Sequence, residues 1–242
     1  MKSTPQSAKV FVGLVAACAL GMLGFGLLRW ESADLVRFAC FVILSAAASR
    51  MKLSLPGLNG NMSMNVPFML LAALELSMSE ALVVALVSIA VQCLPKNGKR
   101  MSALQVVFNM ALIVNAIGAA HFVVQYSSTL GNLPAKSLVL AASALAFFVC
   151  NTVPVALILG LAEKANVVKT WKEICLLTFP YFVLSAGVVS MAATAVHFVG
   201  WQIPLALFPV MALTFASYKR YFAQPAQMAA MPGPFHTSAA AD

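Results

Sequence analysis

Charged residues are scarce in this chain. Asp and Glu together number 7 in 242 residues, and charged residues of all kinds make up 9%, against about 25% in a typical water-soluble domain. No pair of acids has the spacing that carboxylate catalysis uses, and no G-x-S-x-G, phosphate-binding loop or HExxH motif is present. The sequence therefore predicts a protein that is not an enzyme and uses no cofactor.

The patterns that disulfides, metal ions and nucleic acids require are lacking as well. The five cysteines lie in or beside apolar runs without C-x-x-C spacing, which is typical of small apolar residues in a helix bundle. His121 and His197 fall near predicted helix ends without a third ligand of suitable spacing, so we predict no metal site. The net charge of +8 is spread over loops without interleaved aromatics, which favours anionic lipid over nucleic acid as partner.

Long apolar runs are what the sequence does contain. Hydrophobic residues make up 62% of the chain, and the mean hydropathy is +0.91. Runs such as 10–28 and 137–162 are long enough at 1.5 Å per residue to cross a hydrocarbon layer of roughly 30 Å. We therefore predict an all-α fold, a polytopic transmembrane helix bundle.

Eight apolar segments are expected to be helical. They are residues 10–28, 35–49, 65–77, 79–94, 104–124, 137–162, 175–199 and 204–219. The third and fourth are short, so the chain has either six full spans plus a short helical hairpin or eight segments that cross. The first run is longer than the apolar part of a signal peptide, and no A-x-A cleavage site follows it, so we interpret it as a helix.

The distribution of Lys and Arg predicts the orientation in the membrane. If each segment turns the chain round, 12 of the 15 Lys and Arg residues fall on one side and 3 on the other. Such an asymmetry predicts that both termini lie in the cytoplasm. The expected division is a cytoplasmic N-terminus at 1–8, an integral membrane domain at 9–222 and a disordered C-terminal tail at 223–242.

Three connections have local patterns of their own. Residues 51–66 alternate apolar and polar around an Asn-Gly step, which predicts either a small β-hairpin lying on the membrane or the bundle, or an irregular interfacial loop. Ser77 and Glu80 have the spacing of a capping box at a helix start. Residues 167–174 are amphipathic and carry Trp171 among lysines, which predicts a short helix in the cytoplasmic interface.

Polar side chains within apolar segments are costly and are the candidates for ligand binding or interhelical contacts. They are Glu75, Gln105, Asn109, Asn115, Asn151 and Tyr181. Asn115 and Asn151 each lie about eleven residues, or roughly 16 Å, from the cytoplasmic ends of their helices, so we predict a hydrogen bond between them. Such a bond either fastens two helices or forms the floor of a ligand cavity. Glu75 is either a solvated interface residue or a buried proton relay.

Two rows of small residues predict close helix packing. Gly13, Ala17 and Gly21 form one row, and Ala186, Ser190 and Thr194 form the other. They serve either the fold itself or a homodimer. Pro154 and Pro180 lie within predicted helices and are expected to kink them.

Five stretches of the chain resemble a bacterial family. They are residues 55–94, 104–112 (LQVVFNMAL), 151–163 (NTVPVALILGLAE), 171–182 (WKEICLLTFPYF) and 217–223 (SYKRYFA). The sequence is similar to the N-terminal integral-membrane, sensor-like module that precedes HD-GYP or GGDEF cyclic-di-GMP domains in signalling proteins. This resemblance implies a non-enzymatic sensory or scaffold module without an output domain, which acts on a cytoplasmic signalling partner or as a homodimer.

A second likeness concerns the fold alone. An extended segment that enters two short helices looks like the substrate-binding S components of energy-coupling-factor vitamin transporters. That likeness implies a component that binds or transports a small, vitamin-like molecule. The matching loop of those proteins faces outward, whereas the charge distribution places residues 50–64 inside.

Overall fold

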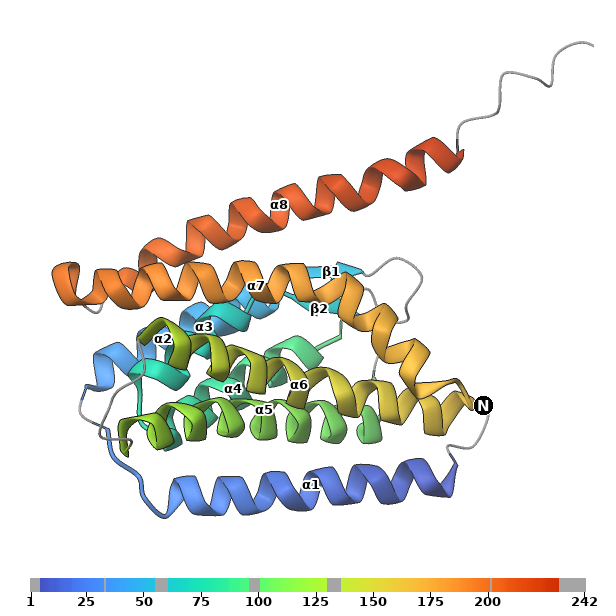
Figure 1. Cartoon of the computed structure of the whole chain (residues 1–242), viewed down its shortest axis with the longest axis horizontal. Helices are drawn as coiled ribbons and strands as arrows, with labels where there is room; N and C mark the ends of the chain where they lie inside the picture. The colour runs from blue at the N-terminus through green and yellow to red at the C-terminus, as the bar shows by residue number, and fades with distance from the viewer. Residues whose placement is uncertain are drawn as a thin grey trace, which may run out of the picture.

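A computed structural model describes residues 5–32, 34–54, 61–95, 101–129, 136–200 and 202–230. Within them the chain forms eight helices and two short strands (Figure 1). In chain order these are α1 (Gln6–Leu27), α2 (Leu35–Ser49), β1 (Lys52–Ser54), β2 (Asn61–Ser63), α3 (Val66–Glu75), α4 (Met78–Cys93), α5 (Ala103–Thr129), α6 (Lys136–Glu163), α7 (Val167–Val199) and α8 (Ile203–Ala230). The predicted helical bundle with a small β-hairpin is confirmed.

Four described helices are long and apolar enough to cross a membrane. Their candidate spans are Gln6–Leu27, Ala103–Ser127, Ser137–Glu163 and Val167–Val196. Helices α2, α3 and α4 are apolar but have only 15, 10 and 16 residues. Helix α8 is long, but Lys219 and Arg220 limit its apolar part to 203–218, about 24 Å of helix. The chain is therefore a helical protein with several membrane-span-like helices.

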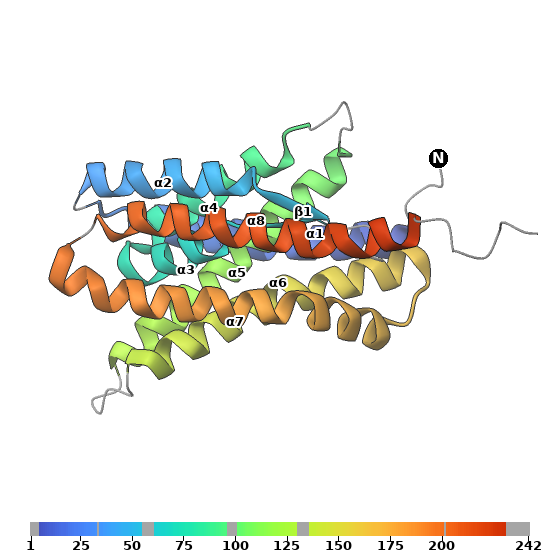
Figure 2. The same cartoon turned by 90° about the horizontal axis from the view of Figure 1, so that it is seen from above.

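The helices run along a common axis and alternate in direction. One end of the bundle, here called the hairpin end, carries the start of α1, the two strands, the α6–α7 connection and the end of α8 (Figures 1 and 2). The other end carries the α1–α2 and α7–α8 connections. Successive helices therefore run in opposite directions, as the division of Lys and Arg residues between two sides of the membrane assumes.

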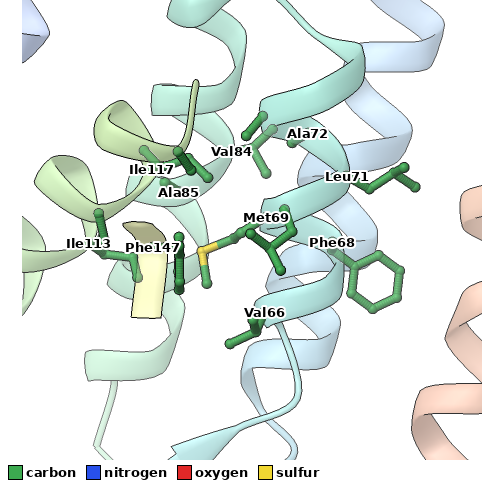
Figure 3. Close-up of a cluster of buried hydrophobic side chains, with 14 of the residues drawn as sticks. Val66, Phe68, Met69, Leu71, Ala72, Val84, Ala85, Ile113, Ile117 and Phe147 are labelled. Carbon is green, nitrogen blue, oxygen red and sulfur yellow. The ribbon is translucent and has the colours of Figure 1, made fainter. Parts of the chain in front are cut away.

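Helix α3 is buried on every side. All residues from Val66 to Ala73 are buried. Val66 and Met69 point toward the side where Ile113 and Phe147 lie, whereas Phe68 points the opposite way (Figure 3). On that other side the Phe68 ring lies 6.3 Å from the ring of Phe208 in α8. A helix that is apolar all round is stable only when it is covered all round, which α2, α4, α5, α6 and α7 achieve together with Phe208 of α8.

Close helix contacts occur at glycines other than those of the predicted row. A Cβ atom at Gly13 or Gly21 would meet nothing within 4 Å, because this face of α1 is exposed. A Cβ atom at Gly26 would lie 2.5 Å from Leu82 Cδ1, and one at Gly118 would lie 2.7 Å from Met22 Sδ. Gly13 and Gly21 therefore make no close contact with the described part of the chain, and the role of the row in a homodimer stays a prediction.

A large side chain at Gly118 is expected to destabilise the protein, because Met22 occupies the space. A Gly118→Leu substitution would drive α5 away from Met22 on α1 and should lower the free energy of unfolding by about 1–3 kcal/mol, the usual cost of overpacking. Unfolding of the purified protein in detergent micelles measures this loss. Gly13→Leu is the matched control, since it adds the same side chain in open space. Equal losses in the two variants would contradict the close α1–α5 contact.

The helix ends show which local signals the sequence carried. Ser77 and Glu80 form the predicted capping box at the start of α4. Residues 167–174 are the first turns of α7, so the separate interfacial helix expected there is wrong: Asn166 caps the helix and nothing interrupts it before Pro180. The ribbon of α7 bends along its length (Figure 1), as expected of an internal proline.

Helix α8 continues to Ala230, beyond the point where we expected a disordered tail to begin. Residues 223–230 are rich in Ala and Gln, which have high helix propensity, but they also include Pro225, so propensity alone does not explain the extension. The rest of the expected tail, 231–242, lies outside the described residues, as does the first half of the segment 1–8, residues 1–4.

Candidate functional site

The β-hairpin packs against the bundle and contributes polar groups to it. Strands β1 and β2 are antiparallel, with Lys52 opposite Ser63 and Leu53 opposite Met62. Leu53, Met62 and Met64 are buried in the main apolar core. The predicted hairpin therefore lies on the bundle, and its turn, at 55–60, lies outside the described residues.

A chain of hydrogen bonds connects the hairpin to α4 and α2. Ser63 Oγ lies 2.7 Å from Asn65 Oδ1 and 3.0 Å from Gln92 Oε1, so its single proton is shared between two amide oxygens. Asn65 Nδ2 donates to Ser88 Oγ over 2.7 Å, and Ser88 Oγ donates to Ser45 O over 3.2 Å. Asn65 is 2% exposed and Ser88 is fully buried. The bonds therefore join elements far apart in the sequence within an apolar interior.

Tyr181 joins α7 to the same group. Its side chain is fully buried, and its hydroxyl donates to Ser63 O over 3.2 Å. We call Ser45, Ser63, Asn65, Ser88, Gln92 and Tyr181 the hairpin network. Tyr181 is the member that the sequence had marked as a candidate.

Two cationic side chains donate hydrogen bonds to carbonyl groups in the last turn of α4, at the hairpin end. Arg50 Nη1 donates to Val91 O over 3.3 Å, and Lys52 Nζ donates to Gln92 O. The last carbonyls of a helix have no partner within the helix, and they carry the negative end of its dipole. Arg50 and Lys52 therefore satisfy α4 at the end where the hairpin network lies.

The hairpin network consists of uncharged groups that hold secondary-structure elements together by hydrogen bonds. Hydroxyls and amides make up the network, and it includes no carboxylate, imidazole or thiol. Ser45 Oγ is buried and has no hydrogen-bond partner within the described part of the chain. In an apolar interior each satisfied bond holds two elements together, and each unsatisfied group costs free energy. The network is suited to holding the hairpin on α2, α4 and α7.

Acidic groups gather at the opposite end of the bundle. Arg37 Nη2 lies 2.6 Å from Glu75 Oε2, and the two side chains are 24% and 23% exposed. Glu75 is thus partly buried and forms an ion pair with Arg37 of α2. Glu80 is 4% exposed and accepts hydrogen bonds from Ser32 Oγ and Ser77 N.

His121 lies at the same end and contacts the last turn of α3. Its Nδ1 lies 3.0 Å from Ala73 O, and its Nε2 lies 3.3 Å from the side-chain nitrogen of Gln125. The side chain of His197, its expected counterpart, lies outside the described residues. Among the described residues, no three His, Cys, Asp or Glu side chains gather as metal ligands would.

The remaining polar candidates are dispersed. Ser102 N donates to Gln105 Oε1 over 2.9 Å, and Gln105 N donates to Ser102 Oγ over 3.3 Å, so this pair caps α5. The Asn109 amide lies within hydrogen-bonding reach of the Cys93 thiol. These residues have structural partners, and neither Gln105 nor Asn109 lines the apolar grooves formed by α5 and α6 or by α2 and α8 in the described part of the chain.

The predicted hydrogen bond between Asn115 and Asn151 is wrong. Asn115 Nδ2 donates instead to Val15 O of α1 over 3.0 Å. Helix α5 packs against both α1 and α6, and its Asn115 faces the first of them. Asn151 is half-buried, and its side chain makes no hydrogen bond within the described part of the chain.

The second predicted row of small residues lies on α7. Ala186 and Ser190 are half-buried and Thr194 is exposed. Thr194 Oγ1 donates to Ser190 O within the helix. Ala186 packs against the main core, so this row contributes to the fold at one of its three positions.

Most members of the hairpin network escaped the sequence analysis. Ser88 and Gln92 are four residues apart and thus share one face of α4, and Ser45 lies on the short helix α2. The spacing of Ser63 and Asn65 within the alternating segment was visible, but alternation in a hairpin does not show which face is buried. The spacing of Ser88 and Gln92 in an apolar segment was the signal that could have identified them as members of a buried polar network.

No family model, curated protein or solved structure matches this chain. Its function is therefore argued from its own residues and their arrangement.

Proposed function

We propose that this chain is a multi-pass protein of the bacterial inner membrane that acts as a non-enzymatic sensory or scaffold module. In this proposal α1, α2, α5, α6, α7 and α8 cross the bilayer, whereas α3 and α4 form a buried hairpin that does not. Both termini lie in the cytoplasm. A change in the bundle moves α8, and α8 passes the movement to a cytoplasmic partner or to a second copy of the chain.

The observation that carries the proposal is how α8 is attached. Its ribbon diverges from α7 toward the hairpin end (Figure 1). Among the residues of α8 whose burial is described, Pro204, Leu207 and Met211 are buried, and Phe215 and Tyr218 continue the same stripe as partly buried residues. In a bilayer, lipid tails replace helix contacts at little hydrophobic cost, so a helix packed along one stripe is free to change position. A helix of this kind is suited to transmit a signal.

The charges support the orientation that signalling to the cytoplasm requires. Most of the described Lys and Arg residues lie at the hairpin end, or in the half of their helix or strand that is nearer to it. They are Lys9, Arg50, Lys52, Lys164, Lys169, Lys172, Lys219 and Arg220. Arg29 and Arg37 lie toward the other end. Cytoplasmic loops carry the excess of Lys and Arg, so the hairpin and the end of α8 would face the same compartment.

The alternative is a component that binds or transports a small, vitamin-like molecule. That reading requires polar side chains that converge on a cavity. Gln105, Asn109 and Asn115 instead have separate structural partners, and Tyr181 donates to a strand carbonyl. These contacts favour the sensory or scaffold function.

Deletion of the gene is expected to change cyclic-di-GMP-dependent motility and biofilm formation, because the resemblance to modules that precede HD-GYP or GGDEF domains implies a partner in that signalling pathway. The full chain with a C-terminal green fluorescent protein should restore the phenotype, and its fluorescence reports membrane location and a cytoplasmic C-terminus. A Leu207→Ala/Met211→Ala variant loosens the buried stripe of α8 and should restore less. Leu213→Ala, at an exposed position of the same helix, is the control.

An unchanged phenotype in the deletion strain would contradict the signalling function. Full restoration by the Leu207→Ala/Met211→Ala variant would contradict the role of α8. In that case the scaffold function would rest on the bundle and the hairpin alone.

A further inference from the structure

A groove with apolar walls lies between α2 and α8. Its volume is about 490 Å³, and its lining residues are Leu35, Val36, Ala39, Cys40, Ile43, Leu44 and Leu205. The only heteroatom among these side chains is the thiol sulfur of Cys40. Leu35, Val36 and Ile43 are each more than 60% exposed, so the groove opens to the surroundings of the bundle.

The groove follows the direction in which lipid chains lie. Its α2 residues recur in pairs four positions apart, 35 and 36, 39 and 40, 43 and 44, which places them in a stripe along the helix axis. From 35 to 44 the stripe is about 13 Å long, close to half of a hydrocarbon layer of roughly 30 Å. It begins at the end of the bundle that lacks the hairpin and runs toward the middle.

We infer that this groove holds one acyl chain of a phospholipid from the leaflet at that end. Walls of this composition offer a polar ligand no hydrogen bond apart from the weak one of the Cys40 thiol, so hydrocarbon is the chemistry that fits them. The exposure of large apolar residues along the groove is stable only against hydrocarbon. A groove oriented along the bundle axis accepts a lipid tail without bending it.

The bound acyl chain would contact α8 close to the residues that pack it against the bundle. Leu205 forms one wall of the groove, and its neighbours Pro204 and Leu207 are buried where α8 meets the bundle. An occupied groove therefore supports α8 in the position seen here, and an empty or overfilled groove changes how α8 packs on α2. This consequence rests on the proposed function, whereas the binding of the chain does not.

Photocrosslinking tests the groove directly. The full chain is reconstituted in phosphatidylethanolamine and phosphatidylglycerol vesicles that contain a phospholipid with a diazirine in the middle of one acyl chain, and labelled peptides are mapped by mass spectrometry. We expect segment 35–44 to be labelled at least about threefold more than segment 187–196 of α7, a preference of roughly 0.65 kcal/mol. Ile43 and Met191 provide the comparison, since both are strongly exposed and each is eight residues from the same end of the bundle.

A variant that fills the groove gives the second comparison. Ala39→Phe places a ring in the groove and should reduce labelling of 35–44 to the level of 187–196. Ala47→Phe adds the same ring to an exposed position of α2 outside the groove and should leave the excess unchanged. Equal labelling of the two segments in the unaltered chain, or an excess that survives Ala39→Phe, would overturn the groove as a lipid site.

The phenotype separates this inference from the proposed function. Ala39→Phe should also fail to restore motility and biofilm formation fully in the deletion strain. If the excess labelling is present and is lost in Ala39→Phe while restoration is complete, the groove binds a chain but does not control α8. If the excess is absent, the lipid site fails whatever the phenotype shows.

Discussion

An Arg37→Ala substitution is expected to lower the free energy of unfolding by about 2–4 kcal/mol. Arg37 Nη2 lies 2.6 Å from Glu75 Oε2, and both side chains are about three-quarters buried between α2 and α3. Removal of one partner leaves a carboxylate without its counter-charge in apolar surroundings, which costs more than the pair itself contributes. The loss is measured by chemical unfolding of the purified protein in micelles.

Two further variants show whether the loss comes from the unpaired charge. Glu75→Gln combined with Arg37→Ala removes the carboxylate as well, and should recover part of the loss with a coupling energy above about 1 kcal/mol. Arg29→Ala is the matched control, because the guanidinium of Arg29 lies exposed over the Phe25 ring at 4.5 Å and contributes about 1 kcal/mol or less. If Arg37→Ala costs no more than Arg29→Ala, Glu75 is a solvated interface residue, as one of the two sequence hypotheses held.

Local patterns predicted most of the helices because their signals are contained in short stretches. The apolar run at 35–49 matches α2 residue for residue, and the Ser77–Glu80 spacing is a capping box in the structure. The alternation on both sides of an Asn-Gly step predicted a hairpin whose strands are β1 and β2. Each of these features is decided by residues within one or two turns of the chain.

The burial of α3 was not predictable in the same way. A ten-residue helix that is apolar on all sides has the composition of a short membrane span, and its own residues do not show what surrounds it. One of its faces is covered by Phe208, which lies 140 positions after Phe68. Only the packing of α8 decides that Phe68 is inside the protein.

The hydrogen-bond partners of the polar side chains could not be predicted from the depth of each residue in the membrane alone. Counting residues from the helix ends places Asn115 and Asn151 at one level of the membrane, but not on facing sides of their helices. Asn115 faces α1, where Val15 O accepts its hydrogen bond. The direction of a side chain around the helix axis depends on which neighbours each helix has, and that order is a property of the whole bundle.

An Asn65→Leu substitution is expected to lower the free energy of unfolding by about 2–3 kcal/mol and to loosen the hairpin. Leucine has nearly the same shape as asparagine but makes none of its hydrogen bonds, so Ser63 Oγ and Ser88 Oγ each lose a partner in a buried position. Tyr181→Phe removes a single bond to Ser63 O and keeps the buried ring, and should cost about 1 kcal/mol. Amide hydrogen exchange of β1 and β2 should become faster in both variants, and more so in Asn65→Leu.

Ser143→Ala is the control that separates the hairpin network from buried polar groups in general. Ser143 is fully buried and donates one hydrogen bond to Ala120 O, between α6 and α5 and away from the hairpin. Its loss should cost about 1 kcal/mol and leave hydrogen exchange in the strands unchanged. If Asn65→Leu behaves like Ser143→Ala in both measurements, then the apolar packing of Leu53, Met62 and Met64 holds the hairpin on the bundle. In that case the bonds among Ser63, Asn65 and Ser88 follow from the position of the hairpin and do not determine it.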